Sequence, residues 1–108
     1  MNMRLRIRKV KSTPVLEVGG EVTCKNINKI TSKLNALRKG DSKIIAIDLN
    51  RTTFIDSSGL GALVYIWRVL EEEHRQLVIF DPLDTIKDIF EDTSLNKLFK
   101  YIRVDEFI

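Results

Sequence analysis

The chain has 108 residues, of which 44% are apolar and 31% charged, with a formal net charge of +3. This composition suits one compact domain with one core and excludes a disordered chain. No apolar run approaches the roughly 20 residues of a membrane span, and the first residues lack the apolar stretch of a signal peptide. Cys24 is the single cysteine and has no internal disulfide partner, so we expect a cytoplasmic protein without membrane insertion.

The positive charge is concentrated at the start of the chain. Residues 3–10 alternate with a period close to two, which predicts a half-buried strand with Arg4, Arg6 and Arg8 on its solvent face. This row either protects an edge strand by its charge or touches acidic groups or phosphate on a partner. The rest of the chain is nearly neutral, so the sequence does not indicate direct binding of nucleic acid.

Two elements are predicted next. A turn at 11–14 leads to a second strand at 15–18, antiparallel to the first, which Gly19 and Gly20 break. Apolar residues at helical spacing then predict a helix at about 24–38, and Gly40 ends it.

The middle of the chain predicts a strand, a turn and a helix. The near-continuous apolar run at 44–49 is typical of a central strand, and Phe54 and Ile55 lead into the turn. A helix follows at about 57–75, with Tyr65 on its surface and its last residues, 71–75, in solvent. Its core face is formed by Leu60, Leu63, Val64, Trp67 and Leu70.

The last third predicts a central strand at 77–80, a helix at about 83–92, a short turn and a strand at about 100–104. Strands that alternate with helices imply parallel pairing, and the first two strands imply an antiparallel hairpin. We therefore predict an α/β fold in a single domain spanning residues 1–108. It would have a mixed sheet with helices packed on it and an N-terminal antiparallel hairpin.

The segment Asp56-Ser57-Ser58-Gly59 lies where a strand meets a helix. Backbone N–H groups at a helix start lack partners within the helix, and the helix dipole favours an anion there. The segment is either a simple helix cap or a functional site. Two adjacent hydroxyls exceed what one cap needs. Gly59 and Gly61 also weaken the helix and leave backbone that another protein can approach.

Catalytic and metal sites are not indicated. His74 is the only histidine and lies about 24 Å from Ser58 at ~1.5 Å per helical residue, too far for a catalytic triad. The hydrolase pattern Gly-x-Ser-x-Gly is absent, and Cys24 has no Cys or His at metal-ligand spacing. We predict that the protein is not an enzyme and needs no metal or cofactor.

Residues 55–63, Ile-Asp-Ser-Ser-Gly-Leu-Gly-Ala-Leu, closely resemble the phosphorylation motif of bacterial anti-sigma factor antagonists, which are STAS domains. Gly20-Glu21-Val22 resembles the family's turn before the first helix, and residues 45–49 resemble its central strand. Residues 94–99 resemble its late short helix. The likeness covers nearly the whole chain and implies a STAS-like domain.

The resemblance implies a partner-switching regulator of transcription. The unphosphorylated protein would bind an anti-sigma factor that is also a serine kinase of the histidine-kinase-like ATPase type. Phosphorylation of Ser58, or alternatively Ser57, would release it, and a PP2C-type phosphatase would reverse the reaction. The implied partner-binding residues are Asp56, Ser57, Ser58, Gly59, Leu60, Gly61, Glu21 and Thr23.

One position departs from the family pattern. The phosphorylated subgroup usually carries an Asp after the Gly-Glu-Val turn, where this chain has Thr23. The missing carboxylate would alter either the recognition of the chain by a kinase or the identity of its partner. The alternative function is that of a STAS scaffold, or an accessory subunit of a signalling or membrane-transport complex, that does not switch.

Overall fold

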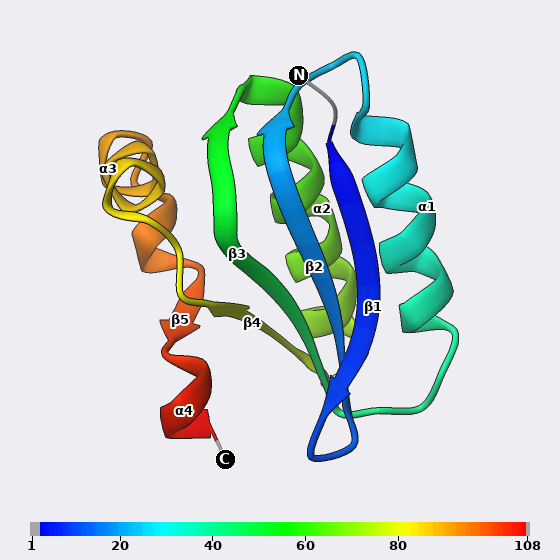
Figure 1. The fold of residues 1–108 in the computed structure, drawn as a ribbon. Helices are drawn as coiled ribbons and strands as arrows, with labels where there is room; N and C mark the ends of the chain where they lie inside the picture. Colours follow the sequence, from blue (N-terminus) through cyan, green and yellow to red (C-terminus); the bar gives the residue numbers. More distant parts are fainter. Residues whose placement is uncertain (1–2, 108) are drawn as a thin grey trace.

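The computed structural model describes residues 3–107 and contains one five-stranded sheet (Figure 1). The elements are β1 (Arg4–Val10), β2 (Thr13–Val22), α1 (Ile27–Arg38), β3 (Ile44–Ile55), α2 (Ser57–Glu72), β4 (Gln76–Phe80), α3 (Asp84–Asp92), η1 (Leu95–Lys97), β5 (Lys100–Ile102) and α4 (Val104–Phe107). The strand order is β1-β2-β3-β4-β5, with β1 antiparallel to β2 and the other pairs parallel. The predicted mixed sheet with an N-terminal hairpin is confirmed. Residues 1–2 and 108 of the predicted domain lie outside the described residues.

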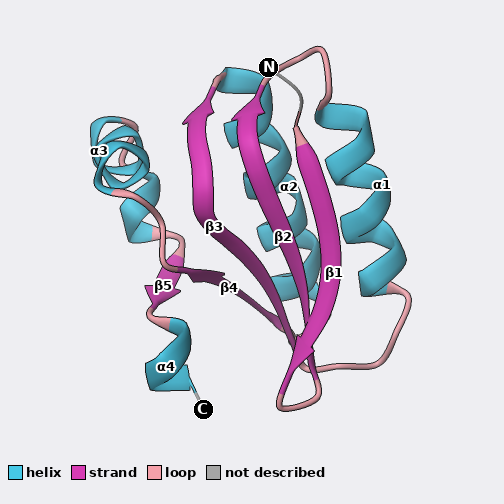
Figure 2. Cartoon of the chain, viewed as in Figure 1, coloured by secondary structure: helices cyan, strands magenta, loops and turns pink. Residues whose placement is uncertain are grey.

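Helices α1 and α2 lie together against one face of the sheet (Figure 2). The main core lies between them and the sheet, where buried Leu34 of α1 and Leu70 of α2 meet Leu16 of β2 and Ile47 of β3. Ile86 and Phe90 bring α3 into the same core. The helical stripes seen in the sequence are therefore the buried faces. Trp67 packs partly buried against this core, and Tyr65 is exposed as predicted.

The opposite face of the sheet has a smaller core that covers only part of it. Val15, Ala46 and Phe80 are buried there, and Val104 and Phe107 of α4 pack on them. Helix α4 was not predicted, because we expected the last strand to continue to residue 104. The strand ends at Ile102, and the Val104 N–H donates to Asp81 Oδ2 at 3.2 Å as the helix begins.

The prediction that Gly19 and Gly20 break the second strand is wrong. Strand β2 continues through both to Val22, and its pairing with β3 shifts register on either side of them. Gly20 takes a positive φ of 97°, which glycine adopts without strain. The irregular pairing is compensated in the interior, where the buried Thr52 hydroxyl donates to the Val18 carbonyl at 2.7 Å.

Two further boundaries differ from the prediction. Strand β3 does not stop at Leu49 but continues to Ile55, because pairing with β2 supports its polar stretch. Helix α1 begins at Ile27 rather than near residue 24, because residues 23–26 form a turn.

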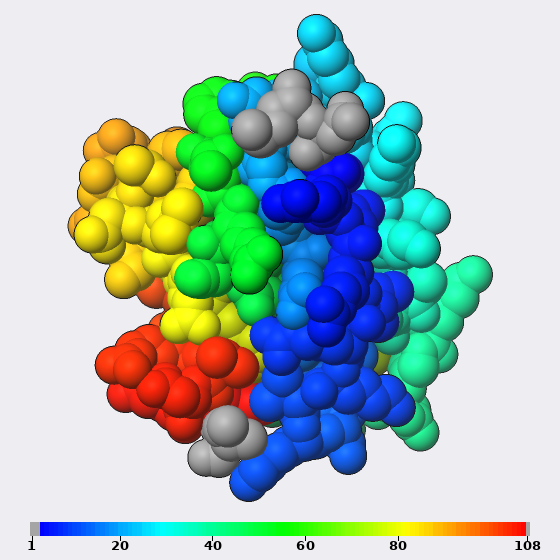
Figure 3. Space-filling model, viewed as in Figure 1, coloured from blue at the N-terminus to red at the C-terminus, as the bar shows by residue number. Residues whose placement is uncertain are grey.

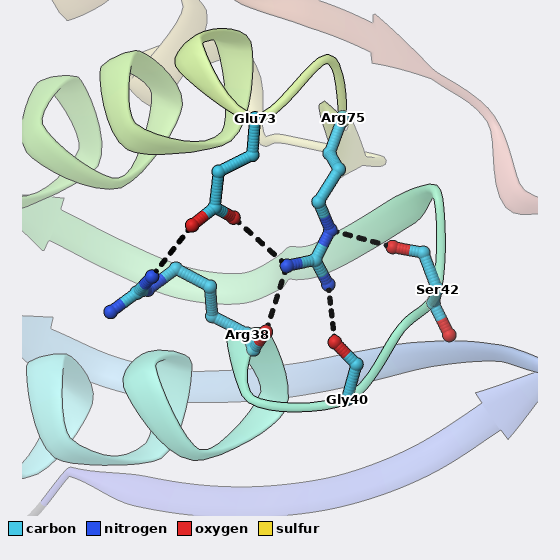
Figure 4. A network of polar contacts seen from close by, with 5 residues as sticks. All are labelled: Arg38, Gly40, Ser42, Glu73 and Arg75. Atoms are coloured by element: carbon cyan, nitrogen blue, oxygen red, sulfur yellow. Dashed lines mark hydrogen bonds and ion pairs between the residues drawn. The ribbon is translucent and has the colours of Figure 1, made fainter.

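Arg75 joins the end of α2 to the loop before β3 (Figure 4). The helix ends at Glu72, and His74 follows with φ 61°. We expected the segment through Arg75 to be solvated, but the Arg75 side chain is only 11% exposed. Its guanidinium donates to the carbonyls of Arg38 at 2.7 Å, Ser42 at 2.8 Å and Gly40 at 3.1 Å, and it pairs with Glu73 at 3.0 Å. One side chain thus satisfies three carbonyls that the α1–β3 connection leaves without partners.

Replacement of Arg75 by Gln is expected to lower the free energy of unfolding by about 2–3 kcal/mol, because several charge-assisted hydrogen bonds are lost together. Urea denaturation followed by circular dichroism measures this difference. The matched control is Arg68→Gln, since Arg68 is an exposed arginine of α2. Equal stability of the two variants would contradict the role given to Arg75.

Candidate functional site

The predicted site lies at one edge of the sheet, where β2 and β3 both end. The two strands are parallel, and Val22 pairs with Ile55 at their carboxyl ends. The loop from β2 to α1 and the first turn of α2 therefore lie side by side (Figure 1). This arrangement brings Glu21 and Thr23, from one segment, to the serines of the other.

Asp56 holds these two segments together. Its backbone N–H donates to the Val22 carbonyl at 3.0 Å. Its Oδ1 accepts from the Gly59 N–H at 3.0 Å, which caps α2, and its Oδ2 accepts from the Cys24 N–H at 3.0 Å. Both carboxylate oxygens are thus used, one by the helix and one by the neighbouring loop.

The loop at 23–26 is closed by Asn26, which was not among the predicted site residues. Asn26 Oδ1 accepts from the Thr23 N–H at 3.0 Å, and its Nδ2 donates to the Glu21 carbonyl at 2.9 Å. The Thr23 hydroxyl accepts from the Lys25 N–H at 3.3 Å. An Asn just before a helical stripe was the available signal, because such side chains commonly close turns.

Ser57 and Ser58 occupy the first two positions of α2 after the cap. Ser57 is exposed and Ser58 is half-buried. Neither hydroxyl makes a hydrogen bond with another residue in the range 3–107. The N–H groups of Gly59 and Leu60 are taken by Asp56, whereas those of Ser57 and Ser58 lie too early in the helix to have a carbonyl partner within it. The cap is therefore Asp56, and the serines are not needed for it.

The two glycines of the motif have different surroundings. Gly59 is buried, and a Cβ there would lie 2.6 Å from Ile55 Cγ2 and 2.8 Å from Val22 Cγ1. Gly61 is exposed, and a Cβ there would meet no described atom within 4 Å. The expected accessible backbone is found at Gly61, while the expectation is wrong for Gly59, whose open side faces the core. Gly59 instead allows α2 to begin close against both strand ends.

The surface around the serines combines polar and apolar groups. Glu21 and Gly61 are exposed, and Thr23 and Leu60 are half-buried. Phe54, which pairs with Glu21 across β2 and β3, is 44% exposed and was not among the predicted site residues. An exposed aromatic side chain beside a hydroxyl-rich turn suits contact with another protein.

Among residues 3–107, no group of three or more His, Cys, Asp or Glu side chains is arranged to hold a metal ion. Over the same residues, no helix has the length and apolar character needed to cross a membrane. His74 lies beyond the far end of α2 from the serines.

Comparison with known sequences identifies relatives along nearly the whole chain. A sequence model of the STAS domain family matches residues 4–106. The anti-sigma-B factor antagonist of Listeria monocytogenes is 26% identical over 106 residues, which cover 97% of this chain and 93% of that protein. Antagonists of this kind are regulatory binding proteins, and the prediction that the chain is not an enzyme is confirmed.

Comparison with solved structures identifies the same fold. The anti-sigma factor antagonist SpoIIAA in its unphosphorylated form superposes with a TM-score of 0.78 at 22% identity, covering 95% of this chain and 91% of that chain. The Bacillus cell fate determinant SpoIIAA in its phosphorylated form gives a TM-score of 0.72 at 22% identity, covering 95% of both chains.

Alanine at the two glycines is expected to change stability in opposite directions. Gly59→Ala should lower the free energy of unfolding by about 1–3 kcal/mol, because Val22 and Ile55 must move. Gly61→Ala should raise it by about 0.5–1 kcal/mol, because alanine favours a helix and meets nothing. Thermal and urea unfolding of the two variants measure both effects, and destabilisation by Gly61→Ala would show that its surroundings are not open.

Proposed function

The chain belongs to the STAS domain family, and we propose that it acts as an anti-sigma factor antagonist in the cytoplasm. In this proposal the unphosphorylated protein binds an anti-sigma factor, a serine kinase of the histidine-kinase-like ATPase type, and so frees a sigma factor. The kinase phosphorylates the antagonist at the start of α2 and thereby releases it. A PP2C-type phosphatase restores the binding form.

The observation that supports the proposal most strongly is that Asp56, and neither serine, caps the start of α2. Asp56 caps the helix, so the hydroxyls of Ser57 and Ser58 can be modified without removing the cap. The unpartnered N–H groups of the first turn and the helix dipole both favour a phosphate there. The fold should therefore survive modification, and the matching relatives include a SpoIIAA structure in a phosphorylated form.

The proposed partner surface surrounds these serines. It is formed by the residues predicted from the sequence, namely Glu21, Thr23, Asp56, Ser57, Ser58, Gly59, Leu60 and Gly61. Within it, Gly59 acts by seating the helix, whereas Gly61 leaves exposed backbone. A phosphate of about −1.5 to −2 charges in this surface must be desolvated when a partner covers it, which opposes binding.

Ser58 is the proposed acceptor, as the resemblance to the family motif implies, with Ser57 as the alternative. Ser58 is half-buried, whereas Ser57 is exposed. Thr23 cannot supply the negative charge of the usual Asp. Kinase recognition in this chain then depends on the loop that Asp56 and Asn26 hold in place.

Phosphorylation is tested with the kinase partner isolated by pull-down with the Ser58→Ala form. We expect Ser58→Ala to fold and bind but to take no phosphate, and the matched control Ser57→Ala to be labelled by the kinase and ATP. Phosphosite mapping by mass spectrometry measures both. Label that persists in Ser58→Ala but is lost in Ser57→Ala would move the acceptor to Ser57, and no label at either serine would contradict the switch.

Ser58→Asp is expected to weaken binding to the same partner, because the added carboxylate must be desolvated in the interface. A loss of about 3–4 kcal/mol, such as a phosphate would cause, corresponds to several hundred-fold in affinity, and Asp should give part of it. Isothermal calorimetry measures the affinity. Equal affinity of Ser58→Asp and the unmodified protein would favour the non-switching scaffold.

A further inference from the structure

The sheet face opposite α1 and α2 is divided into zones along its strands. In Figure 3 this face is toward the viewer, and β1 and β3 lie uncovered beside α4. The lower zone is the small apolar core under α4, and an ion cluster lies next to it. In the remaining zone, toward the carboxyl ends of β2 and β3, none of the helices within residues 3–107 covers the sheet, and the surface carries cationic side chains.

The ion cluster is centred on Arg8 and uses the nearest carboxylates. Arg8 pairs with Glu17 and, at 2.8 Å, with Asp48 Oδ2. We expected Arg8 on the solvent face of its strand, but its side chain is only 27% exposed. Burial acts to lower the pKa of the Arg8 guanidinium, yet the hydrogen bonds to Asp48 and Glu17 outweigh it and the pKa is raised. Glu17 also pairs with Arg6 at 3.7 Å, so both carboxylates are engaged by Arg6 and Arg8.

Arg4 and Arg51 converge on Gly19. Gly19 pairs with Arg4 of β1 on one side and with Arg51 of β3 on the other, which places the two arginines about 10 Å apart at Cα. A Cβ built on Gly19 would lie 3.7 Å from Arg51 Cβ, 3.9 Å from Arg4 Cβ and 4.0 Å from Arg4 Nε. Neither arginine has an ion-pair partner within the described part of the chain. The Arg4 guanidinium thus lies over Gly19, and the Arg51 side chain begins on its other side.

Gly19 is not required by the backbone at this position. Unlike Gly20, it has no positive φ, and an added Cβ would make only ordinary contacts. Its lack of a side chain has a different effect, since it leaves space above β2 between the arginine side chains of β1 and β3. Mutual repulsion of the two guanidinium groups is relieved by an anion between them.

The arginines stand at the wall of a groove of about 890 Å³, within the range of small-molecule sites. Asn50 and Asp81 also line this groove and present groups that accept or donate hydrogen bonds. We propose that Arg4, Gly19 and Arg51 form a binding site for the phosphate of a small hydroxylated phosphate ester. The guanidinium forks match phosphate oxygens, and the carboxylate of Asp81 accepts from hydroxyl groups of the ester. The carboxylates of the groove disfavour a ligand that is anionic throughout.

The test is a titration of the ¹⁵N-labelled Ser58→Ala protein with inorganic phosphate and with glycerol 3-phosphate at constant ionic strength. We expect saturable shifts at the Gly19 amide and at Nε–H of Arg4 and Arg51, with tighter binding of the ester. Arg4→Gln and Arg51→Gln should each weaken binding on the order of tenfold, as loss of a charge-assisted hydrogen bond implies. Gly19→Val should weaken it with both arginines present.

Lys9→Gln is the matched control, because Lys9 lies on the same strand but its side chain is on the other face. It should leave the affinity unchanged. Unchanged affinity in Arg4→Gln and Arg51→Gln, shifts spread over all basic residues, or shifts confined to the amides of positions 57 and 58 at the start of α2 would each overturn the site. Equal affinity for both probes would contradict a hydroxylated ligand. The outcome is independent of partner switching, since the variant used has no Ser58 hydroxyl.

Discussion

The carboxylate of Asp56 is the constraint on which the candidate site depends. One oxygen caps α2 through Gly59 and the other holds the loop after β2 through Cys24. The two segments are 32 residues apart in sequence, and only the parallel pairing of β2 and β3 brings them together. A helix start that is capped by the preceding residue leaves its first hydroxyls without a structural task. That freedom is the physical basis on which we propose a reversible modification there.

The same strands organise both faces of the sheet. Toward the helices, Val22 and Ile55 are packed so closely on Gly59 that the position of α2 is fixed by the strand ends. On the open face, Glu17 and Asp48 form their ion pairs with Arg6 and Arg8. The charges of Arg4 and Arg51 have no ion-pair partner among the described residues. Packing therefore defines one surface and the distribution of charge defines the other. The proposed partner surface around Ser57 and Ser58 and the proposed phosphate site at Arg4, Gly19 and Arg51 can act independently. They lie on the same strands but share no described side chain.

The repeating patterns of the sequence were sufficient for most of the fold. Helical stripes such as Ile30 and Leu34, and the apolar run of β3, report burial directly, and burial dominates the choice between helix and strand. Single polar side chains with distant partners were not predictable. We expected Arg75 to be in solvent, because its hydrogen-bond partners are distant in the sequence. The carbonyls of Arg38, Gly40 and Ser42 come close to it only in the folded chain. The two glycines of β2 predicted the end of that strand. The hydrogen bond from the Thr52 hydroxyl to the Val18 carbonyl, which supports the irregular pairing there, comes from β3 and was not visible in the local sequence.

Only the outline of the candidate site could be predicted, because its remaining contacts also join residues that are distant in the sequence. Local sequence showed that residues 56–61 begin a helix, but the second bond of Asp56 and the closure of the loop by Asn26 depend on three-dimensional pairing. Gly59 and Gly61 look equivalent in the sequence, and only their neighbours separate a packing role from an exposed one. Arg8 likewise shares the alternation of Arg4 and Arg6, but its guanidinium reaches Asp48 of β3 across β2.

The most direct test of this account is amide hydrogen exchange in Asp56→Ala. If one carboxylate holds both segments, the N–H groups of Gly59 and Cys24 should lose protection together, while amides in the centre of β3 remain protected. A change at Gly59 alone, with Cys24 exchanging as in the unmodified protein, would contradict it. Asp56 would then be an ordinary helix cap, and the loop would be held by other contacts.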